Sequence, residues 1–389
     1  MRARLLALLI ICTSGVAGAE AQEPQPQTRA ELLAREREEK AQDLAPPRHG
    51  RLERTLLALE NDRIFERILN PAEGLYPKIG NITPGSGFAM GPGYRRPAII
   101  GDEVHFSTFA VASIQKYWMV DARLTMPELV RGRVFGEVHA RKYDYPEEDF
   151  FGLGPDSQRE DETAYGLRST DFGGSAGVRV TPWLSFGSGV EYMTPRVTVL
   201  GNQPDFIRSE VSAEVNTREP RGNPRQGLRY ALAYQRFDGR DGSQLDFDRV
   251  EADVQHYISL YKQRRVLALR GFASVSDASS GGEVPFYFMR TLGGPDDLRG
   301  FRRFRFRDRN MLLLQAEYRW EIFTALDGAI FYDAGKVAPR AEDLNFKDLE
   351  SDYGIGFRFG TRNGVFLRIE GAFGSSGGAH YIFRFGHVF

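Results

Sequence analysis

The amino-acid sequence predicts an all-β fold, a 16-stranded antiparallel transmembrane β-barrel preceded by a short helical segment. Three observations lead to this fold class. Apolar and polar side chains alternate over one segment after another, aromatic residues make up 12% of the chain beside 42 glycines, and no run of 18 apolar residues occurs. Because only every second residue of a barrel strand meets lipid, such a chain combines strong local alternation with the absence of a long apolar helix.

Residues 1–21 have the pattern of a secretory signal peptide. Arg2 and Arg4 form a positive region, the stretch from Leu5 to Cys12 is apolar, and "VAGAEA" offers small residues for cleavage. The apolar stretch is too short to cross a bilayer as a helix. A barrel that carries an export signal is expected in the bacterial outer membrane.

No metal site or catalytic site is expected. Cys12 is the only cysteine, so the exported chain can form no disulfide and no thiolate metal site. No two of the six histidines have the spacing of metal ligands on one strand face. Two "G-x-S-x-G" matches, Gly173–Gly177 and Gly374–Gly378, fall in a strand and in a glycine-rich turn, whereas a nucleophile elbow needs a strand–turn–helix. We therefore expect no cofactor and no enzyme activity.

Residues 22–80 are expected to form a periplasmic helical leader. "RAELLAREREEKAQDL" is a charged helix, "APPRHG" interrupts it, and "RLERTLLALENDRIFERIL" places Leu52, Leu56 and Leu59 at roughly helical spacing. Two interpretations stay open. The segment is a plain leader with a small helix, or its helix docks in or under the mouth of the barrel.

Residues 81–389 are expected to form the barrel, since the period of the pattern becomes two. The clearest strand places Leu312 and Leu314 on one face and Gln315 and Glu317 on the other. A water-soluble sandwich would also alternate. Charged residues on one face of strand after strand, with aromatic residues near strand ends, favour a wet or plugged lumen and an interfacial girdle. The expected strands cover residues 82–95, 103–114, 117–127, 132–144, 162–180, 183–195, 204–217, 226–238, 245–261, 264–276, 284–292, 308–322, 325–335, 352–360, 363–373 and 379–389.

The first expected strand, "ITPGSGFAMGPGYRRP", is rich in glycine and proline, which weaken ladder pairing. The contact between the first and last strands is therefore expected to be the weakest seam of the barrel. The same strand count places the connection "YPEEDFFGLGPDSQRED" on the periplasmic side, where barrel turns are usually short. Either the first expected strand is misplaced, or this barrel departs from that rule.

The chain ends in "HYIFRFGHVF", with Tyr381, Phe383, Phe385 and Phe389 on one strand face. An aromatic last residue after alternating apolar positions looks like the signal that the bacterial barrel-assembly machinery reads. That machinery is the expected partner for insertion of the chain itself.

Two motifs resemble those of the bacterial surface antigen family, the superfamily of BamA- and TamA-type assembly barrels. The stretch "FYFMRTLGGPDDLRGFRRFRFRDRN" contains an R-G-F tripeptide after the eleventh strand, and "AIFYDAGKV" contains F-x-D-x-G on the thirteenth. The resemblance implies a barrel of sixteen strands that serves protein assembly into, or translocation across, the outer membrane. It also implies a set of lumenal residues, here called the loop lock: Arg299, Gly300, Phe301, Phe331, Asp333 and Gly335.

The resemblance implies that the loop folds into the lumen and that Arg299 pairs with Asp333. A guanidinium withdrawn from water needs a carboxylate, preferably a bidentate one, which supports the pairing. Gly335 lacks a side chain and leaves room for the loop, and Phe301 can pack against Phe331.

The other arginines of "DDLRGFRRFRFRDRN" have several possible roles. A nucleic-acid patch is excluded because an exported barrel does not meet that substrate. A solvated charge run, pairing with lumenal Glu251, Glu317, Glu321 or Glu370, and contact with lipopolysaccharide phosphates stay open. These choices concern the following residues: Arg302, Arg303, Arg305, Arg307 and Arg309.

Residues 22–80 are too short for the periplasmic (POTRA) domains that BamA relatives carry, so the resemblance is to a compact member without them. Capture of clients would then need a separately encoded periplasmic partner, or the helices of the leader would recruit it. Outer-membrane lipid and lipopolysaccharide are the other expected partners. The alternative is a passive pore or a structural surface barrel without insertase activity.

Overall fold

The chain divides into two compact units, Met1–Gly50 and Arg51–Phe389. In the first unit the computed structural model describes Thr28, Arg29, Leu33 and Arg37, of which the last three are helical. In the second unit it describes 73–384, except 100, 102, 202, 241–243, 280, 324–325, 362–363 and 375–377. The expected signal peptide and most of the expected leader lie outside the described residues.

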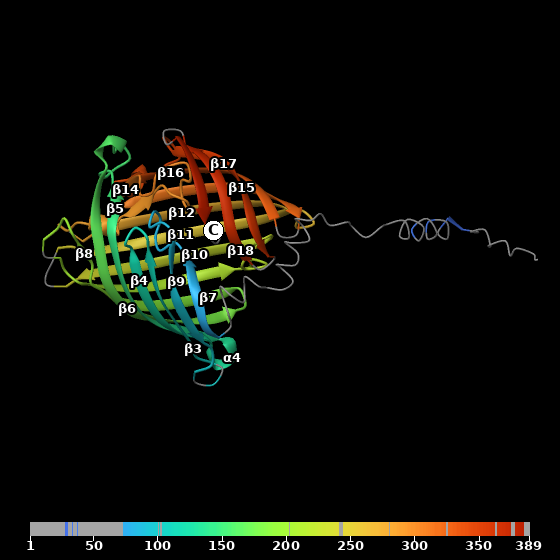
Figure 1. Ribbon diagram of the computed structural model, residues 1–389, viewed down its shortest axis with the longest axis horizontal. Helices are drawn as coiled ribbons and strands as arrows, with labels where there is room; N and C mark the ends of the chain where they lie inside the picture. Colours follow the sequence, from blue (N-terminus) through green and yellow to red (C-terminus); the bar gives the residue numbers. More distant parts are fainter. Residues whose placement is uncertain are drawn as a thin grey trace, which may run out of the picture. The chain divides into compact units, whose positions relative to one another are not determined.

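The described residues of the second unit form an antiparallel β-barrel of sixteen strands (Figure 1). Each barrel strand pairs with the next one along the chain. The barrel strands are β1 (Gly74–Gly80), β2 (Ala89–Arg96), β3 (His105–Ser113), β4 (Trp118–Glu128), β5 (Val134–Phe150), β6 (Thr163–Thr181), β7 (Leu184–Met193), β9 (Phe206–Asn216), β10 (Gly227–Gly239), β11 (Phe247–Tyr261), β12 (Arg265–Ala278), β15 (Asn310–Phe323), β16 (Leu326–Ala338), β17 (Glu350–Thr361), β18 (Gly364–Gly374) and β19 (Gly378–Arg384).

Short elements lie in the connections. β8 adds to the edge of β6, and β13 pairs with β14 in a separate two-stranded sheet. None of the helices among the described residues is both long and apolar enough to cross a bilayer. The short elements are α4 (Leu129–Gly132), η1 (Arg159–Asp161), β8 (Arg196–Val197), η2 (Phe286–Phe288), β13 (Arg290–Leu292), β14 (Phe306–Asp308) and η3 (Ala341–Asp343).

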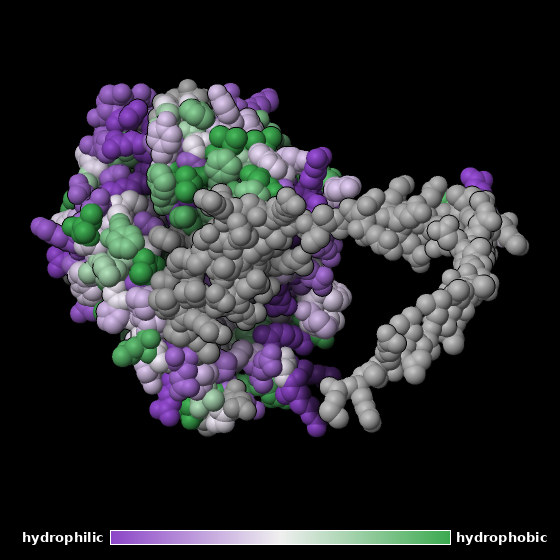
Figure 2. Space-filling view, turned by 45° about the vertical axis from the view of Figure 1, so that its right-hand side comes forward, coloured by the Kyte–Doolittle hydropathy of each residue, from purple (hydrophilic) through white to green (hydrophobic). Residues whose placement is uncertain are grey.

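Side chains of the barrel strands sort by parity, as expected from the sequence. On β10, Leu232 is 55% exposed on the outer face, between Tyr230 and Tyr234. Arg229 lies on the inner face and binds acidic residues of both neighbouring strands. On the face seen in Figure 2, hydrophobic side chains gather on the outer wall beside hydrophilic ones at the margins.

The expected strand at 284–292 is wrong. Residues Phe286–Phe288 form a 3-10 turn after Pro285, and Arg290–Leu292 pair with β14. The aromatic residues of this segment do not alternate between two faces. Instead, Phe288 packs against Phe237 and Phe247 of the barrel wall, which fixes the segment as an insertion inside the barrel.

The barrel begins seven residues earlier than expected, because residues Gly74–Gly80, assigned to the leader, form β1 and pair with β2. Gly74, Pro77 and Gly80 conceal this strand from a pattern search. Tyr76 is buried over Gly93, where a Cβ atom would lie 2.4 Å from its ring. The missed strand and the false one offset each other, so the count of sixteen holds.

With β1 included, the connection between β5 and β6 moves to the end of the barrel that holds the connection between β12 and β15. The two touch, since Gly154 N–H donates to the Arg307 carbonyl at 2.9 Å. Turns at the other end are short, such as 182–183 and 262–264. Of the two explanations for the placement of "YPEEDFFGLGPDSQRED", a misplaced first strand is confirmed. The long connections share the end that faces outward in such barrels.

A lysine at position 232 tests which side chains of the barrel strands face lipid. Leu232→Lys places a charge on the lipid face near the middle of β10 and is expected to cost about 2–4 kcal/mol in the free energy of unfolding, measured by urea titration in lipid bilayers.

Ala231→Lys is the matched control. It faces the lumen between Glu214 and Asp253, its partners on the two adjacent strands, and is expected to be tolerated. Equal losses in both variants would contradict the assignment of the two faces.

Candidate functional site

The connection between β12 and β15 covers residues 279–309, and its segment 284–309 lies inside the barrel. Leu298 has no exposed area and Phe301 is almost completely buried. Both belong to one apolar cluster with residues of the barrel wall and of the hairpin that β13 and β14 form inside the barrel. The other members of this cluster are Leu292, Phe306, Met311, Leu313 and Val337.

Two glycines make the turn that brings the loop inward. Gly293 and Gly294 have φ angles of 108° and 118°, which residues with a Cβ atom rarely adopt. A Cβ atom at Gly293 would lie 2.2 Å from the carbonyl oxygen of Arg302, so the returning chain also requires glycine there.

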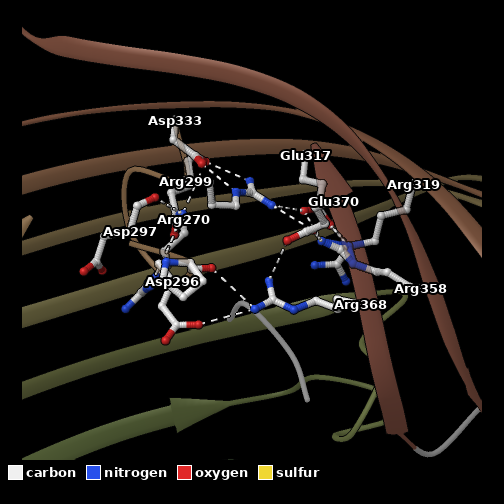
Figure 3. A network of polar contacts seen from close by, with 12 residues as sticks. Arg270, Asp296, Asp297, Arg299, Glu317, Arg319, Asp333, Arg358, Arg368 and Glu370 are labelled. Carbon is white, nitrogen blue, oxygen red and sulfur yellow. Dashed lines mark hydrogen bonds and ion pairs between the residues drawn. The ribbon is translucent and has the colours of Figure 1, made fainter. Parts of the chain in front are cut away.

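Arg299 is buried among three carboxylates (Figure 3). Its Nε donates to Asp333 Oδ2 at 2.6 Å and its Nη2 donates to Asp333 Oδ1 at 2.9 Å, which is a bidentate pair. Its Nη1 donates to Glu317 at 3.1 Å and to Glu370 at 3.2 Å. β15, β16 and β18 each contribute one of these acids, so a single loop residue joins three strands.

Phe331 covers the flat face of this guanidinium. The central carbon of the Arg299 guanidinium lies 3.4 Å from the centre of the ring, in a stacked cation–π contact. Planar stacking together with a bidentate pair is a geometry that lysine cannot reproduce.

Arg299 remains charged in this position. Burial alone would lower its pKa, but Asp333, Glu370 and Glu317 hold the pKa above the ordinary value of arginine. A buried charge of this kind is costly once it loses its partner, since removing one member of a buried ion pair typically costs about 3–5 kcal/mol.

The ionic network continues along the wall (Figure 3). Three further arginines are almost completely buried, and each contacts Glu317 or Glu370. Arg368 also contacts Asp296 of the loop at 3.4 Å, and Arg384 of β19 contacts the same carboxylate at 2.5 Å. The three are Arg319 and Arg358, which bind Glu317, and Arg368, which binds Glu370.

Gly300 brings the loop backbone into contact with the wall. A Cβ atom there would lie 2.5 Å from the backbone nitrogen of Gly374 and 2.6 Å from the Cβ atom of Asp352. A Cβ atom at Gly374 would in turn lie 2.4 Å from the carbonyl oxygen of Gly300. The glycine of the R-G-F motif therefore allows Arg299 to approach the inner wall.

The remaining arginines of the loop mostly contact the end of β5 and the connection between β5 and β6. Arg303 forms a bidentate pair with Asp149, at 2.7 and 3.0 Å. Arg302 contacts Glu162, and Arg305 donates to Ser157. These three arginines are therefore paired and not merely solvated. Their partners differ from the glutamates that the sequence analysis named.

A family model for the Omp85 superfamily domain matches residues 158–376. The chain belongs to the Omp85 superfamily. The matched range contains both motifs of the loop lock, and the sequence-based resemblance to BamA-type barrels is confirmed. This Omp85 chain is accordingly an outer-membrane barrel similar to BamA and CdiB.

Solved structures share the fold. The Omp85 chain is similar to BamA from Haemophilus ducreyi lacking POTRA domains 1–3, with a TM-score of 0.63 and 17% identity over 81% of this chain and 70% of that one. It is also similar to CdiB from Escherichia coli, with a TM-score of 0.56 and 11% identity over 79% of this chain and 59% of that one. CdiB from Acinetobacter baumannii gives a TM-score of 0.52 and 12% identity, with coverage of 80% and 59%. A search of curated proteins gave no match.

The Omp85 barrel arranges two residues of the loop lock differently from the expectation. Phe301 packs against Phe306 and lies in a different cluster from Phe331, whose ring is covered by Arg299 instead. At Gly335, a Cβ atom would lie 3.1 Å from Leu292 of the inserted hairpin but only 2.7 Å from the Leu312 carbonyl oxygen. Glycine at position 335 therefore makes space for the backbone of β15 as well as for the inserted hairpin.

Sequence reasoning missed several residues of the network. It named Glu317 and Glu370 as partners for other arginines, whereas they bind Arg299. Charged residues at alternate positions of the last strands were a signal that could have identified the rest. The residues missed are Arg319, Arg358, Arg368, Asp352 and Gly374.

The C-terminal aromatic residues are described in part. Tyr381 and Phe383 are 78% and 68% exposed on the outer face of β19, while Phe385 and Phe389 lie outside the described residues. Across the described part of the chain no cluster of three or more metal-ligating side chains occurs. Gly173–Gly177 lies within β6, and the second "G-x-S-x-G" match includes residues outside the description.

A double-mutant cycle on the ion pair measures its coupling. Arg299→Ala leaves three buried carboxylates without this cation and is expected to cost at least as much as Asp333→Ala, about 3–5 kcal/mol in the free energy of unfolding. Because both changes remove the same bidentate contact, the double variant should be little worse than Arg299→Ala alone. Strictly additive losses would contradict the pairing.

A methyl group at Gly374 tests the close approach of the loop. Gly374→Ala is expected to displace Gly300 and to increase single-channel conductance in planar bilayers, because the loop then fills the lumen less well. Gly371→Ala on the same strand is the control, since a Cβ atom there meets nothing within 4 Å. Unchanged conductance in Gly374→Ala would show that the loop does not need this contact.

Proposed function

We propose that this Omp85 barrel assembles proteins into the outer membrane or translocates them across it. In this proposal residues 1–21 direct export, and the leader before β1 or a separately encoded periplasmic protein captures clients. The edge of β19 and the loop lock are the parts of the barrel that carry the activity. The observation that supports this most strongly is a cavity along the edge of the last strand.

The cavity has a volume of about 990 Å³ and is lined by His380, Tyr381, Ile382, Phe383 and Arg384 of β19. Successive residues of a strand point to opposite faces, so five consecutive residues can line one cavity only along the edge of the strand. The other edge of β19 pairs with β18, whereas the described residues of β1 and β19 form no ladder with each other.

A strand edge that is not covered by a ladder is a template for pairing with another strand. An incoming extended segment could add to β19 by main-chain hydrogen bonds, which depend little on its sequence. Such a mode suits a barrel that must accept many different clients.

The same cavity connects the edge of β19 to the loop lock. Its lining includes Arg299, Phe301 and Arg303 of the loop, and Arg303 donates to the carbonyl of Pro84 in the connection between β1 and β2 at 3.1 Å. The loop therefore contacts the first hairpin and, through Asp296 and Arg384, the last strand. Movement of the loop would change both sides of the seam.

A passive pore is less well supported. Leu298 and Arg299 of the loop are buried within the lumen, and the arginines of the wall bind carboxylates there. A lumen filled in this way favours a barrel that works at its wall over one that conducts steadily through its centre.

Depletion of the protein from its host is the functional test. The expected result is a loss of other outer-membrane barrels or of exported proteins from the envelope, measured by quantitative mass spectrometry of outer membranes. If their amounts and folding are unchanged, the proposed function is wrong and the passive alternatives take its place.

A cross-link across the seam tests the role of the β19 edge. Asn81 and His380 line the same cavity. In the variant Asn81→Cys with His380→Cys, joining the two cysteines with a bis-maleimide should abolish complementation of the depleted strain. Phe373→Cys with Ala379→Cys is the control, because this link joins residues already paired between β18 and β19 and should leave complementation intact. Equal activity of both cross-linked forms would contradict a role for an opening seam.

A further inference from the structure

Asp352 of β17 differs from the three acidic side chains that bind Arg299. It is 1% exposed, it faces the lumen, and neither of its carboxylate oxygens has a hydrogen-bond partner in ordinary geometry within the described residues. Each neighbouring carboxylate of the network contacts at least one arginine. The pairs are Asp333 with Arg299, Glu317 with Arg299, Arg319 and Arg358, and Glu370 with Arg299, Arg358 and Arg368.

Asp352 stands directly opposite Asp333. The two residues are partners in the antiparallel ladder of β16 and β17, so their side chains lie on the same face of the sheet. Directly opposed side chains have Cβ atoms about 4.5–5.5 Å apart, and like charges at that spacing repel. Among the described residues, the groups that act on the Asp352 carboxyl are the Asp333 carboxyl, the Gly300 N–H and the Arg299 guanidinium. Its ladder partner on β18 is Gly374, which has no side chain.

The Arg299 guanidinium beside this pair already binds other carboxylate oxygens. Two of its nitrogens bind both oxygens of Asp333, and Gln315 donates to the same carboxylate at 3.2 Å. The third nitrogen binds Glu317 and Glu370. Two carboxylates in one dry site with one cation between them cannot both ionise cheaply, so such pairs hold a proton.

We infer that Asp352 and Asp333 form a proton-binding site under the loop, with the proton carried by Asp352. As a neutral acid, Asp352 donates its O–H to the Asp333 carboxylate, which leaves Asp333 charged and bidentate to Arg299. Both oxygens of Asp352 then need no cation. The contact of Gly300 with the Asp352 side chain excludes water from the pair and keeps the proton in place.

The site couples a proton to the position of the loop, and in this respect the inference rests on the proposed function. When the loop leaves the lumen, water reaches Asp352 and the acid ionises. The seated loop therefore binds one more proton than the released loop. By linkage, seating is strongest at low pH and weakens as the pH rises through the range in which the site loses its proton.

Infrared spectroscopy of the purified barrel tests the proton directly. A protonated carboxylic acid has a C=O stretch separate from that of carboxylates and shifted by H/D exchange. We expect such a band near neutral pH, lost in Asp352→Asn and in Asp352→Ser. Asparagine can donate a hydrogen bond to Asp333 as the protonated acid does, so Asp352→Asn should keep the loop seated and the barrel folded. If Asp352→Asn does not fold, Asp352→Ser takes its place as the test variant.

Asp297→Asn is the matched control on the loop. Burial and the adjacent Asp296 raise the pKa of Asp297 to about 7, so this acid also titrates near neutrality. The band assigned to Asp352 should persist in Asp297→Asn. Absence of any band sensitive to the Asp352 substitutions would overturn the inference.

Loop movement gives the second measurement. Between about pH 5 and pH 10, trypsin should cleave the arginine-rich loop of the wild-type barrel increasingly fast as the pH rises, after correction for trypsin activity on an unfolded substrate. Asp352→Asn should remove most of this increase. An unchanged pH profile in Asp352→Asn would refute the coupling, and because neither measurement uses a client, both are independent of the depletion test.

Discussion

Burial of Arg299 is the constraint on which the rest of the barrel interior depends. A guanidinium that leaves water must be matched by acids placed beforehand, and here three strands each supply one. The loop between β12 and β15 can be seated in only one way, because the bidentate pair fixes the plane of the guanidinium and Phe331 fixes its face. Glycines at positions 293, 294, 300 and 374 bring the chain close enough for this contact.

The seated loop links parts of the barrel that are distant in sequence. Its arginines bind Asp149 and Glu162 near the connection between β5 and β6, and Arg303 donates to Pro84 next to the first hairpin. Asp296 binds Arg384 of the last strand. A strand edge that must stay available for pairing can also pair with the wrong chain and cause aggregation. A loop that contacts both sides of the seam can hold this edge in place until it is needed, and a proton on Asp352 would set how firmly it does so.

The sequence predicted the class of fold and the position of the central ion pair, because both depend on local patterns. Alternation over β15 to β18 is strong, and Arg299 and Asp333 stand in recognisable motifs. The sequence did not predict β1, since glycine and proline dominate it and the buried Tyr76 is its one clear anchor. It also read 284–292 as a strand, because three consecutive aromatic residues suit a wall as well as an inserted turn. Cross-strand neighbours such as Asp333 and Asp352 depend on register, which a single sequence does not specify.

Hydrogen–deuterium exchange of the loop backbone is the most direct test of a seated loop. The amides of Gly294 and Phe301 both donate to the Leu298 carbonyl, and the amide of Phe304 donates to the Gly293 carbonyl. If Arg299 holds the loop in the lumen, these amides should exchange as slowly as those of β15 and β16, and Arg299→Ala should make them fast. Exchange in the wild-type barrel as fast as in the exposed connection 339–349 would contradict the account.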